Sequence, residues 1–281
     1  MIIVTLTTIP SRIKHIQPVI DNILNQSMPP DRIELYIPKE YKKRSLGSID
    51  PHDYPTGCDI VHCDEDYGPA TKILPAIQRY KDQDVTLIYC DDDKIHDHYW
   101  IERFIQKHNV YPDACIAEVG MHVKWWFFYR WKDTVTRQYR LKRILSLGIW
   151  NPKRKVHTDE CHEIALGFGG VLVKPSFFPP EVFDIPDILW TVDDIWLSGM
   201  MATNGIKVRE TDKNPAQSSS DIFPTEGDPL RNYVYNGYGR DESNILCMQY
   251  FIDKYGIWKK YETLCKTSLE NVKNDVRKYM A

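Results

Sequence analysis

The stretch Val85-Thr86-Leu87-Ile88-Tyr89-Cys90-Asp91-Asp92-Asp93 runs from an apolar segment straight into three carboxylates. A short, continuous run of β-branched, aliphatic and aromatic residues predicts a buried strand over 85–89. Neighbouring carboxylates repel one another and are costly to desolvate, so three together beside such a strand usually need a cation. Mg²⁺ or Mn²⁺ suits them, because a hard divalent ion completes its shell with diphosphate oxygens and water. A solvated acidic turn is the alternative interpretation.

Strands and helices alternate on both sides of this stretch. Strands are predicted at 2–6, 33–37, 59–63, near 115, at 171–174 and near 208, and helices at 13–24, 70–80, 98–108, 193–203, 242–255 and 263–279. This alternation predicts an α/β fold with a mostly parallel, doubly wound sheet. Ligands bind such sheets at the carboxyl ends of the strands, where the triple aspartate lies.

Two further segments bring polar side chains to the predicted binding edge. In Asp66-Tyr67-Gly68-Pro69-Ala70-Thr71-Lys72, glycine permits close approach to the backbone and proline begins a helix. Lys72 would lie one turn inside that helix, near enough to neutralise phosphate or carboxylate charge. The alternative is a simple capped junction between a loop and a helix. The stretch 214–241, with three Pro, three Gly and a Ser triplet, is interpreted as a long loop or lid.

The segment Trp190-Thr191-Val192-Asp193-Asp194-Ile195-Trp196 places two carboxylates at a predicted helix start, between two tryptophans. Thr191 or Asp193 could simply cap the helix. A carboxylate in this position can also accept a proton from an incoming hydroxyl, and aromatic faces are surfaces on which sugar rings stack. The segment therefore predicts either a capped helix or part of an active site.

The composition bounds the class of protein. The chain has 281 residues, 42% hydrophobic and 27% charged, which favours one large or two small globular domains and excludes a disordered chain. The formal net charge of −3 is too balanced for a protein that coats nucleic acid. Residues 121–156 nevertheless carry ten basic side chains and one acid, a net +9 against −12 for the rest. With its many aromatic residues, this stretch is interpreted as a wall against which an acceptor, a glycan or an anionic carrier, would bind. The alternative is a core strand followed by a solvated basic helix.

The compartment is predicted from the cysteines and from the start of the chain. Seven cysteines without a CxxC pair favour reduced thiols. The first residues lack the basic region of a signal peptide and the roughly 20 apolar residues of a membrane span. We therefore expect a soluble, cytoplasmic protein, in the host cytoplasm if it is viral, without a transmembrane segment.

The order of these motifs resembles that of nucleotide-sugar glycosyltransferases of the GT-A fold, similar to family-2-like and related viral or bacterial enzymes. The resemblance extends over roughly residues 1–210. It rests on Thr7-Thr8-Ile9-Pro10-Ser11-Arg12, the Lys72 segment, Asp91-Asp92-Asp93, Gly167 to Gly170 and Val192-Asp193-Asp194. It implies a Rossmann-like mixed sheet flanked by helices. It also implies a catalytic domain over 1–212, with a lid and C-terminal helices over 213–281 packed on the same domain.

The resemblance also implies roles for individual residues. The donor nucleotide would contact Thr7, Thr8, Arg12, Asp66, Tyr67, Gly68, Lys72, Asp91 and Asp92. Asp93 would bind the metal ion directly, with Asp91 reaching the ribose or a metal-bound water. Asp194 would be the catalytic base, and the acceptor side would include Gly169, Gly170, Trp190 and Asp193. Many relatives have a metal-binding histidine late in the chain, but this sequence has none after His162. The metal would therefore rest on Asp93 with phosphates and water, or use the 214–241 loop.

The implied reaction is transfer of a hexosyl or pentosyl group, with inversion, from a nucleotide-diphosphate sugar to a hydroxyl of an oligosaccharide or glycoconjugate. A UDP-sugar is the preferred donor, and Mn²⁺ or Mg²⁺ the expected cofactor. Arg240 could be a lid contact to the diphosphate, or an ordinary surface arginine. A retaining transferase, a metal-dependent nucleotidyltransferase and an inactive sugar-nucleotide-binding or glycan-binding protein are the alternatives.

Overall fold

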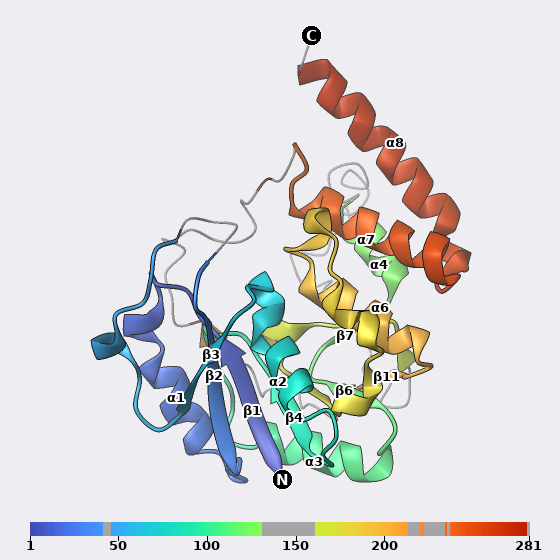
Figure 1. Cartoon of the computed structure of the whole chain (residues 1–281). Helices are drawn as coiled ribbons and strands as arrows, with labels where there is room; N and C mark the ends of the chain where they lie inside the picture. The colour runs from blue at the N-terminus through green and yellow to red at the C-terminus, as the bar shows by residue number, and fades with distance from the viewer. Residues whose placement is uncertain (42–45, 131–160, 213–219, 222–233, 235–236, 280–281) are drawn as a thin grey trace, which may run out of the picture.

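The computed structural model describes residues 1–41, 46–130, 161–212, 220–221, 234 and 237–279. Its centre is an eight-stranded sheet with the order β3-β2-β1-β4-β10-β6-β11-β8 (Figure 1). The strands are β1 (Ile2–Thr7), β2 (Arg32–Pro38), β3 (Asp59–Cys63), β4 (Thr86–Tyr89), β6 (Cys115–Ala117), β8 (Cys161–His162), β10 (Val171–Val173) and β11 (Val208–Glu210).

Strand direction divides the sheet. β3, β2, β1 and β4 run parallel to one another, as expected for a doubly wound fold. β10 lies antiparallel between β4 and β6, and β8 lies antiparallel to β11. β11 is parallel to β6, so six of the eight strands point the same way, and the sheet is mixed but mostly parallel, as expected. Strands of two or three residues do not reveal their direction in a hydrophobic pattern, because the pattern is the same when it is read backwards.

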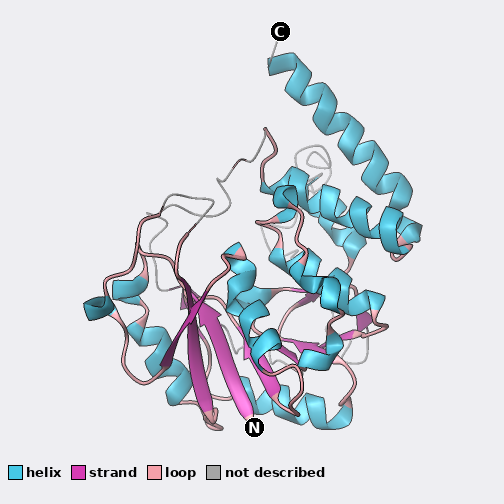
Figure 2. Cartoon of the chain, in the orientation of Figure 1, coloured by secondary structure: helices cyan, strands magenta, loops and turns pink. Residues whose placement is uncertain are grey.

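Successive strand residues point to opposite sides of the sheet, so both faces carry apolar side chains. Helices cover both faces (Figure 2). On β4, Ile88 packs into one core, and Leu87 and Tyr89 pack into the other. The first core holds α1 (Gln17–Leu24) and α3 (Trp100–Val110), and the second holds α2 (Leu74–Arg79) and α6 (Asp193–Thr203). Strands buried on both faces explain why the run before the carboxylates is apolar without alternation.

The C-terminal helices pack on the second core. α7 (Arg240–Tyr255) lies against α6, where the Trp196 and Phe251 ring centroids are 5.5 Å apart. A Cβ atom on Gly199 would lie 2.3 Å from the Phe251 ring, so glycine permits this close helix approach. α8 (Glu262–Tyr279) follows and extends away from the sheet in Figure 1. In the part of the chain described above, no helix is both long and apolar enough to cross a membrane.

Two small two-stranded sheets and one further helix lie outside the main sheet. β5 (Lys94–Ile95), directly after the carboxylates, pairs antiparallel with β12 (Ser220–Asp221) in the expected lid stretch. β7 (Gly120–Met121) pairs with β9 (Ile164–Ala165), and α4 (Val123–Arg130) begins the basic aromatic stretch. The proposed acceptor wall over 121–156 and the lid over 214–241 lie largely outside the described residues, so both stay predictions.

Candidate active site

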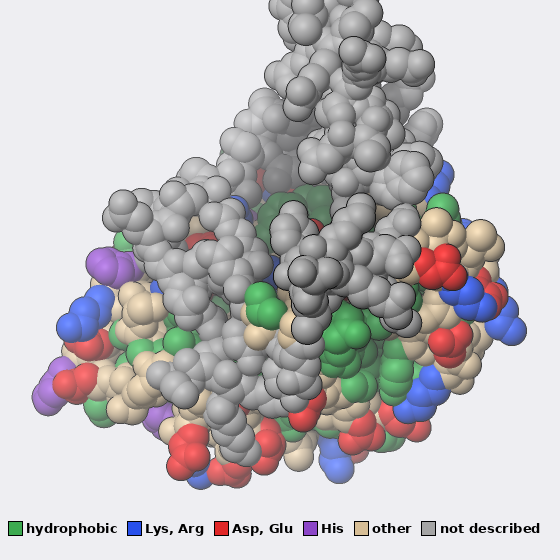
Figure 3. Space-filling view, turned by 90° about the horizontal axis from the view of Figure 1, so that it is seen from above, with side chains coloured by type: hydrophobic (Ala, Val, Ile, Leu, Met, Phe, Trp, Pro, Cys, Tyr) green, Lys and Arg blue, Asp and Glu red, His purple; other side chains and the backbone are tan. Residues whose placement is uncertain are grey.

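Segments that are distant in sequence meet at the carboxyl edge of the parallel strands. Val171 at the start of β10 pairs with Tyr89 at the end of β4. Because the two strands are antiparallel, the loop that enters β10 lies beside the loop that leaves β4. The expected Gly167-to-Gly170 and Asp91-to-Asp93 segments therefore face one another. Figure 3 looks down on this edge, where parts of acidic, basic and hydrophobic side chains are visible.

Asp92 holds the loop that follows β1. It is 6% exposed and accepts hydrogen bonds from Thr8 Oγ1 at 2.6 Å and from Arg12 Nη1 at 2.7 Å. Burial raises the pKa of Asp92, and the Arg12 guanidinium only partly offsets that effect. Thr7 turns away and donates its hydroxyl to the Tyr36 carbonyl at 2.7 Å. The loop after β1 is thus tied to the middle carboxylate, with Arg12 part-exposed at the edge.

Asp93 has the features of a cation ligand. Its Oδ2 atom lies 3.6 Å from Arg12, while Oδ1 is buried and accepts no hydrogen bond from any residue that the structure describes. Burial, and then the charges of Asp91 and Asp92, raise the pKa of Asp93. A buried oxygen without a donor, in a strongly negative setting, is the environment that a divalent cation stabilises.

The described residues do not form a complete metal cage. Among them, no group of three or more His, Cys, Asp or Glu side chains is arranged to hold a metal ion. Asp91 Oδ1 and Asp92 Oδ1 are already bonded to protein cations, whereas Asp93 Oδ1 is buried without a hydrogen-bond partner among the described residues. The residues therefore fit an ion that would take most of its ligands from phosphates and water, as Mg²⁺ often does.

Lys72 joins the two carboxylate motifs. Its Nζ atom lies 2.6 Å from Asp91 Oδ1 and 2.7 Å from Asp193 Oδ2, and its side chain is 3% exposed. Burial disfavours the charged lysine, but the charges of Asp193, Asp91 and Asp194 outweigh it and raise the pKa of Lys72 well above its ordinary value. Burial likewise opposes ionisation of Asp91, and Lys72 more than compensates, so the pKa of Asp91 is lowered.

Asp194 lies in the first turn of α6, beside this lysine. Its Oδ1 atom accepts the Gly167 backbone N–H at 2.8 Å, and its side chain is partly exposed. Burial and, next, the negative charge of Asp193 raise the pKa of Asp194 to about 7. A carboxylate with a pKa near neutrality is suited to take up a proton in a reaction at physiological pH. Arg240, at the start of α7, lies 3.8 Å from Asp193 Oδ1.

Trp190 supports the loop before η3 (Gly68–Lys72), the short 3-10 helix that carries Lys72. Its Nε1 atom donates to the Asp66 carbonyl at 3.2 Å, and the side chain is buried. Gly68 has a φ of +59°, and a Cβ atom there would lie 2.7 Å from the Trp190 ring, so this tight contact requires glycine. The residue that was predicted to contact an acceptor is mainly packed on the donor-side loop, and its acceptor role stays a prediction.

The fold has counterparts among solved structures, although no protein-family model and no curated protein sequence matches the chain. The S. aureus TarS fragment 1–349 in complex with UDP aligns with TM-score 0.51 at 10% identity, over 96% of this chain and 70% of that chain. The same fragment with UDP-GlcNAc gives 0.48 at 10% identity, over 96% and 71%. A longer TarS structure gives 0.49 at 10% identity; this chain spans 96% of its own length but only 42% of that chain. This chain has a TarS-like fold.

The TarS-like fold confirms the expected GT-A-type architecture, a mixed α/β sheet flanked by helices. Within it, the predicted residues form two groups joined by Lys72. One group is centred on Asp92 and the other on the α6 carboxylates. The assignment of these residues to donor, acceptor and metal stays a prediction.

Phe168 is the site residue that the sequence interpretation missed. It is 39% exposed, between the buried Gly167 and Gly169, and the Lys94 ammonium lies 5.7 Å from its ring centroid. The backbone on both sides is pressed against protein, because a Cβ on Gly167 would lie 2.7 Å from Lys72 Nζ and one on Gly169 3.1 Å from Glu118. The phenyl ring therefore points outward, one residue after the Gly167 N–H that Asp194 accepts. An aromatic residue between two glycines was the signal that could have indicated it.

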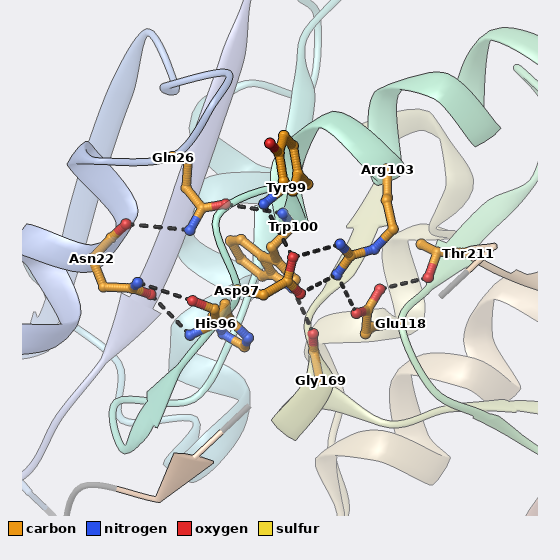
Figure 4. A network of polar contacts seen from close by, with 10 residues as sticks. All are labelled: Asn22, Gln26, His96, Asp97, Tyr99, Trp100, Arg103, Glu118, Gly169 and Thr211. Carbon is orange, nitrogen blue, oxygen red and sulfur yellow. Dashed lines mark hydrogen bonds and ion pairs between the residues drawn. The ribbon is translucent and has the colours of Figure 1, made fainter. Parts of the chain in front are cut away.

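A polar network behind the edge holds both loops (Figure 4). Trp100 Nε1 donates to the Gly169 carbonyl at 2.8 Å, and a Cβ on Gly170, whose φ is +93°, would lie 2.3 Å from the Trp100 ring. Arg103 bonds Asp97 through both terminal nitrogens and bonds Glu118 at 2.7 Å. Asp97 follows the carboxylate loop and Glu118 follows β6, so this network fixes the carboxylate loop relative to the Gly-rich loop.

Proposed function

We propose that this chain is a metal-dependent glycosyltransferase that moves a sugar, with inversion, from a UDP-sugar to a hydroxyl of a glycan or glycoconjugate. The observation that carries the proposal is the pairing of two carboxylate motifs across Lys72. One motif ends strand β4 and has an unused, buried Asp93 oxygen, and the other begins helix α6 with a carboxylate of pKa about 7. A cation-binding acid beside a neutral-pH base is what this transfer needs.

The donor would lie along the loops after β1 and β4. The TarS fragment of similar fold is in complex with UDP, which supports a uridine nucleotide here. The proposed donor contacts are Thr7, Thr8, Arg12, Asp66, Tyr67, Gly68, Asp91 and Asp92, with Arg240 at the diphosphate. Asp92 holds Arg12 and Thr8 in place, so these two side chains are preorganised before the nucleotide arrives.

The metal ion would be held by Asp93, with Asp91 as the second aspartate, and would be Mn²⁺ or Mg²⁺. When bound, it would supply positive charge for the departing diphosphate. Arg12 and Arg240 would add to this stabilisation, because both guanidinium groups lie next to the carboxylate motifs. Among the described residues Asp93 has a buried oxygen without a hydrogen-bond partner, and no group of three or more side chains is arranged to hold a metal ion, so the donor phosphates would complete the site.

Asp194 would act as the general base. The acceptor hydroxyl would lose its proton to the Asp194 carboxylate as its oxygen attacks the anomeric carbon from the face opposite the nucleotide. The Gly167 N–H fixes one carboxylate oxygen of Asp194. The acceptor would be bounded by Gly169, Gly170 and Asp193, with Trp190 farther back and Phe168 as a surface on which a sugar ring can stack.

UDP release tests the proposal. Purified protein with Mn²⁺ should release UDP from one member of a panel of UDP-sugars, slowly with water and faster with an acceptor. Binding of UDP-sugar without any release would favour an inactive binding protein. The anomeric coupling constant of the product, read by proton NMR, separates inversion from retention.

All seven cysteines are free thiols, which suits the cytoplasmic location that we also propose.

A further inference from the structure

Lys72 is enclosed by the protein itself. Its side chain is 3% exposed, and its ammonium contacts Asp91 on one side and Asp193 on the other. An ammonium group has three N–H donors, so two are accounted for by these carboxylates. The Gly167 backbone lies directly over the ammonium, since a Cβ atom there would be 2.7 Å from Nζ, and the Tyr89 ring centroid lies at 5.6 Å. Little room remains for a ligand phosphate at this nitrogen.

We propose that Lys72 is a positioning residue, which joins Asp91 of the metal motif to Asp193 of the base motif and does not itself bind the donor. This inference rests on the proposed function. The two carboxylates come from segments about 100 residues apart, and Lys72 comes from a third segment. The ion pairs at 2.6 and 2.7 Å therefore set the spacing between the diphosphate end of the site and the start of α6.

The pairing also distinguishes the two α6 carboxylates. Asp193 is 3% exposed, with Oδ2 on Lys72 and Oδ1 facing Arg240 at 3.8 Å. Asp194 instead accepts a neutral backbone N–H. Since both oxygens of Asp193 face cations, Asp194 is the member of the pair left to take a proton from an acceptor. Lys72 thereby selects the base as well as placing it.

Binding and turnover separate this role from that of a donor ligand. We expect Lys72→Met to slow UDP-sugar turnover on the order of 100-fold, because small displacements of reacting groups cost that much, while the Kd for UDP with Mn²⁺ changes by less than about threefold. Lys72→Arg keeps the charge and should recover part of kcat. A loss of UDP affinity as large as the loss of kcat would identify Lys72 as a donor contact and overturn the proposal.

Stability measurements test the pairing even if Lys72→Met folds poorly. Removal of one partner of a buried pair leaves charges unpaired, so Lys72→Met should lower the urea midpoint, and adding Asp193→Asn should restore part of it. Lys107→Met is the control: Lys107 is buried too but pairs with the exposed Asp212. It should leave UDP binding and turnover unchanged.

The stability outcomes decide the pairing independently of turnover. If the effects of Lys72→Met and Asp193→Asn simply add, the two side chains are not coupled and the proposal fails. If no UDP-sugar is turned over by the wild type, the proposed function fails, whereas the coupling of Lys72 to Asp193 is still measured by this cycle.

Discussion

Gly167 donates its backbone N–H to the Asp194 carboxylate over 2.8 Å, and this bond joins the Gly-rich loop to the first turn of helix α6. It fixes the orientation of a carboxylate whose charged neighbours are Asp193, Asp91, Lys72 and Arg240. The same loop covers Lys72 and projects Phe168 outward. A single backbone segment thus contacts the proposed base, the lysine that places it and the proposed sugar-stacking ring.

The pH dependence should follow Asp194. Because burial and the Asp193 charge raise the pKa of Asp194 to about 7, the base is protonated and inactive in acid, and the transfer rate should rise through this pH to a plateau. The Asp193→Asn variant removes the neighbouring negative charge, so its rate profile should move to lower pH. A rate profile that Asp193→Asn leaves unmoved argues against Asp194 as the titrating group.

A raised native pKa also means that the contribution of Asp194 to stability is present in acid and is lost as the pH rises through about 7. Urea unfolding of the wild type and of Asp194→Asn across this pH range checks the sign of this change in the free energy of unfolding.

Metal dependence should centre on Asp93. UDP should raise the melting temperature of the wild type much more with Mn²⁺ than with EDTA, because a ligand of the native state stabilises it. In Asp93→Asn the buried, unpartnered oxygen is no longer a carboxylate, so the additional effect of Mn²⁺ should disappear. Asp82 offers the control, because its side chain is 84% exposed. Asp82→Asn should behave as the wild type does. Equal stabilisation by UDP with Mn²⁺ and with EDTA would argue against a metal site.

Phe168 should determine acceptor affinity. Phe168→Ala removes the proposed stacking surface in the Gly-rich loop, so the KM for the acceptor should rise about 10-fold, as expected for a loss of about 1–1.5 kcal/mol. Release of UDP in the absence of acceptor should not change, and Phe168→Tyr should behave like the wild type. Tyr99→Ala, which removes another exposed aromatic ring, is the control. A slower release of UDP without acceptor would place Phe168 on the donor instead.

Arg103 should stabilise the fold and the site together. Arg103→Met leaves Asp97 and the fully buried Glu118 without their cation, which should cost about 3–5 kcal/mol of unfolding free energy in urea. The exposed pair of Lys39 and Asp64 gives the contrast, because solvent screens it and Lys39→Met should cost far less unfolding free energy. Similar losses in the two variants would show that the network of Figure 4 is not a strong constraint.

Much of the fold could be predicted because its elements carry strong local signals. The strand over 59–63 and the helix over 193–203 match β3 and α6 at both ends. The helix expected over 70–80 is instead η3 followed by α2, because Gly68 to Lys72 form the tighter turn that brings Lys72 to the carboxylates. The directions of β10 and β8 could not be predicted, since they depend on pairing between distant segments.

The candidate site was predictable in its residue types but not in its contacts. Runs of acids after a strand and at a helix start indicated where charge collects. Lys72 was expected at a donor phosphate, yet its position between Asp91 and Asp193 depends on three segments meeting in space. Trp190 was expected on the acceptor side because aromatic residues stack on sugars, whereas its packing on Gly68 is a tertiary contact. Phe168 was overlooked because its exposure depends on the buried backbone on both sides of it.

Turnover by Asp194→Asn tests the central claim most directly. With Mn²⁺ and the UDP-sugar that the wild type uses, we expect the rate of transfer to fall by about 10²–10⁴-fold, the usual contribution of a general base, while the Kd for UDP stays within about threefold. Asp187→Asn, a conservative change of another carboxylate ahead of α6, should keep wild-type activity. Transfer by Asp194→Asn at a rate close to that of the wild type would contradict the account.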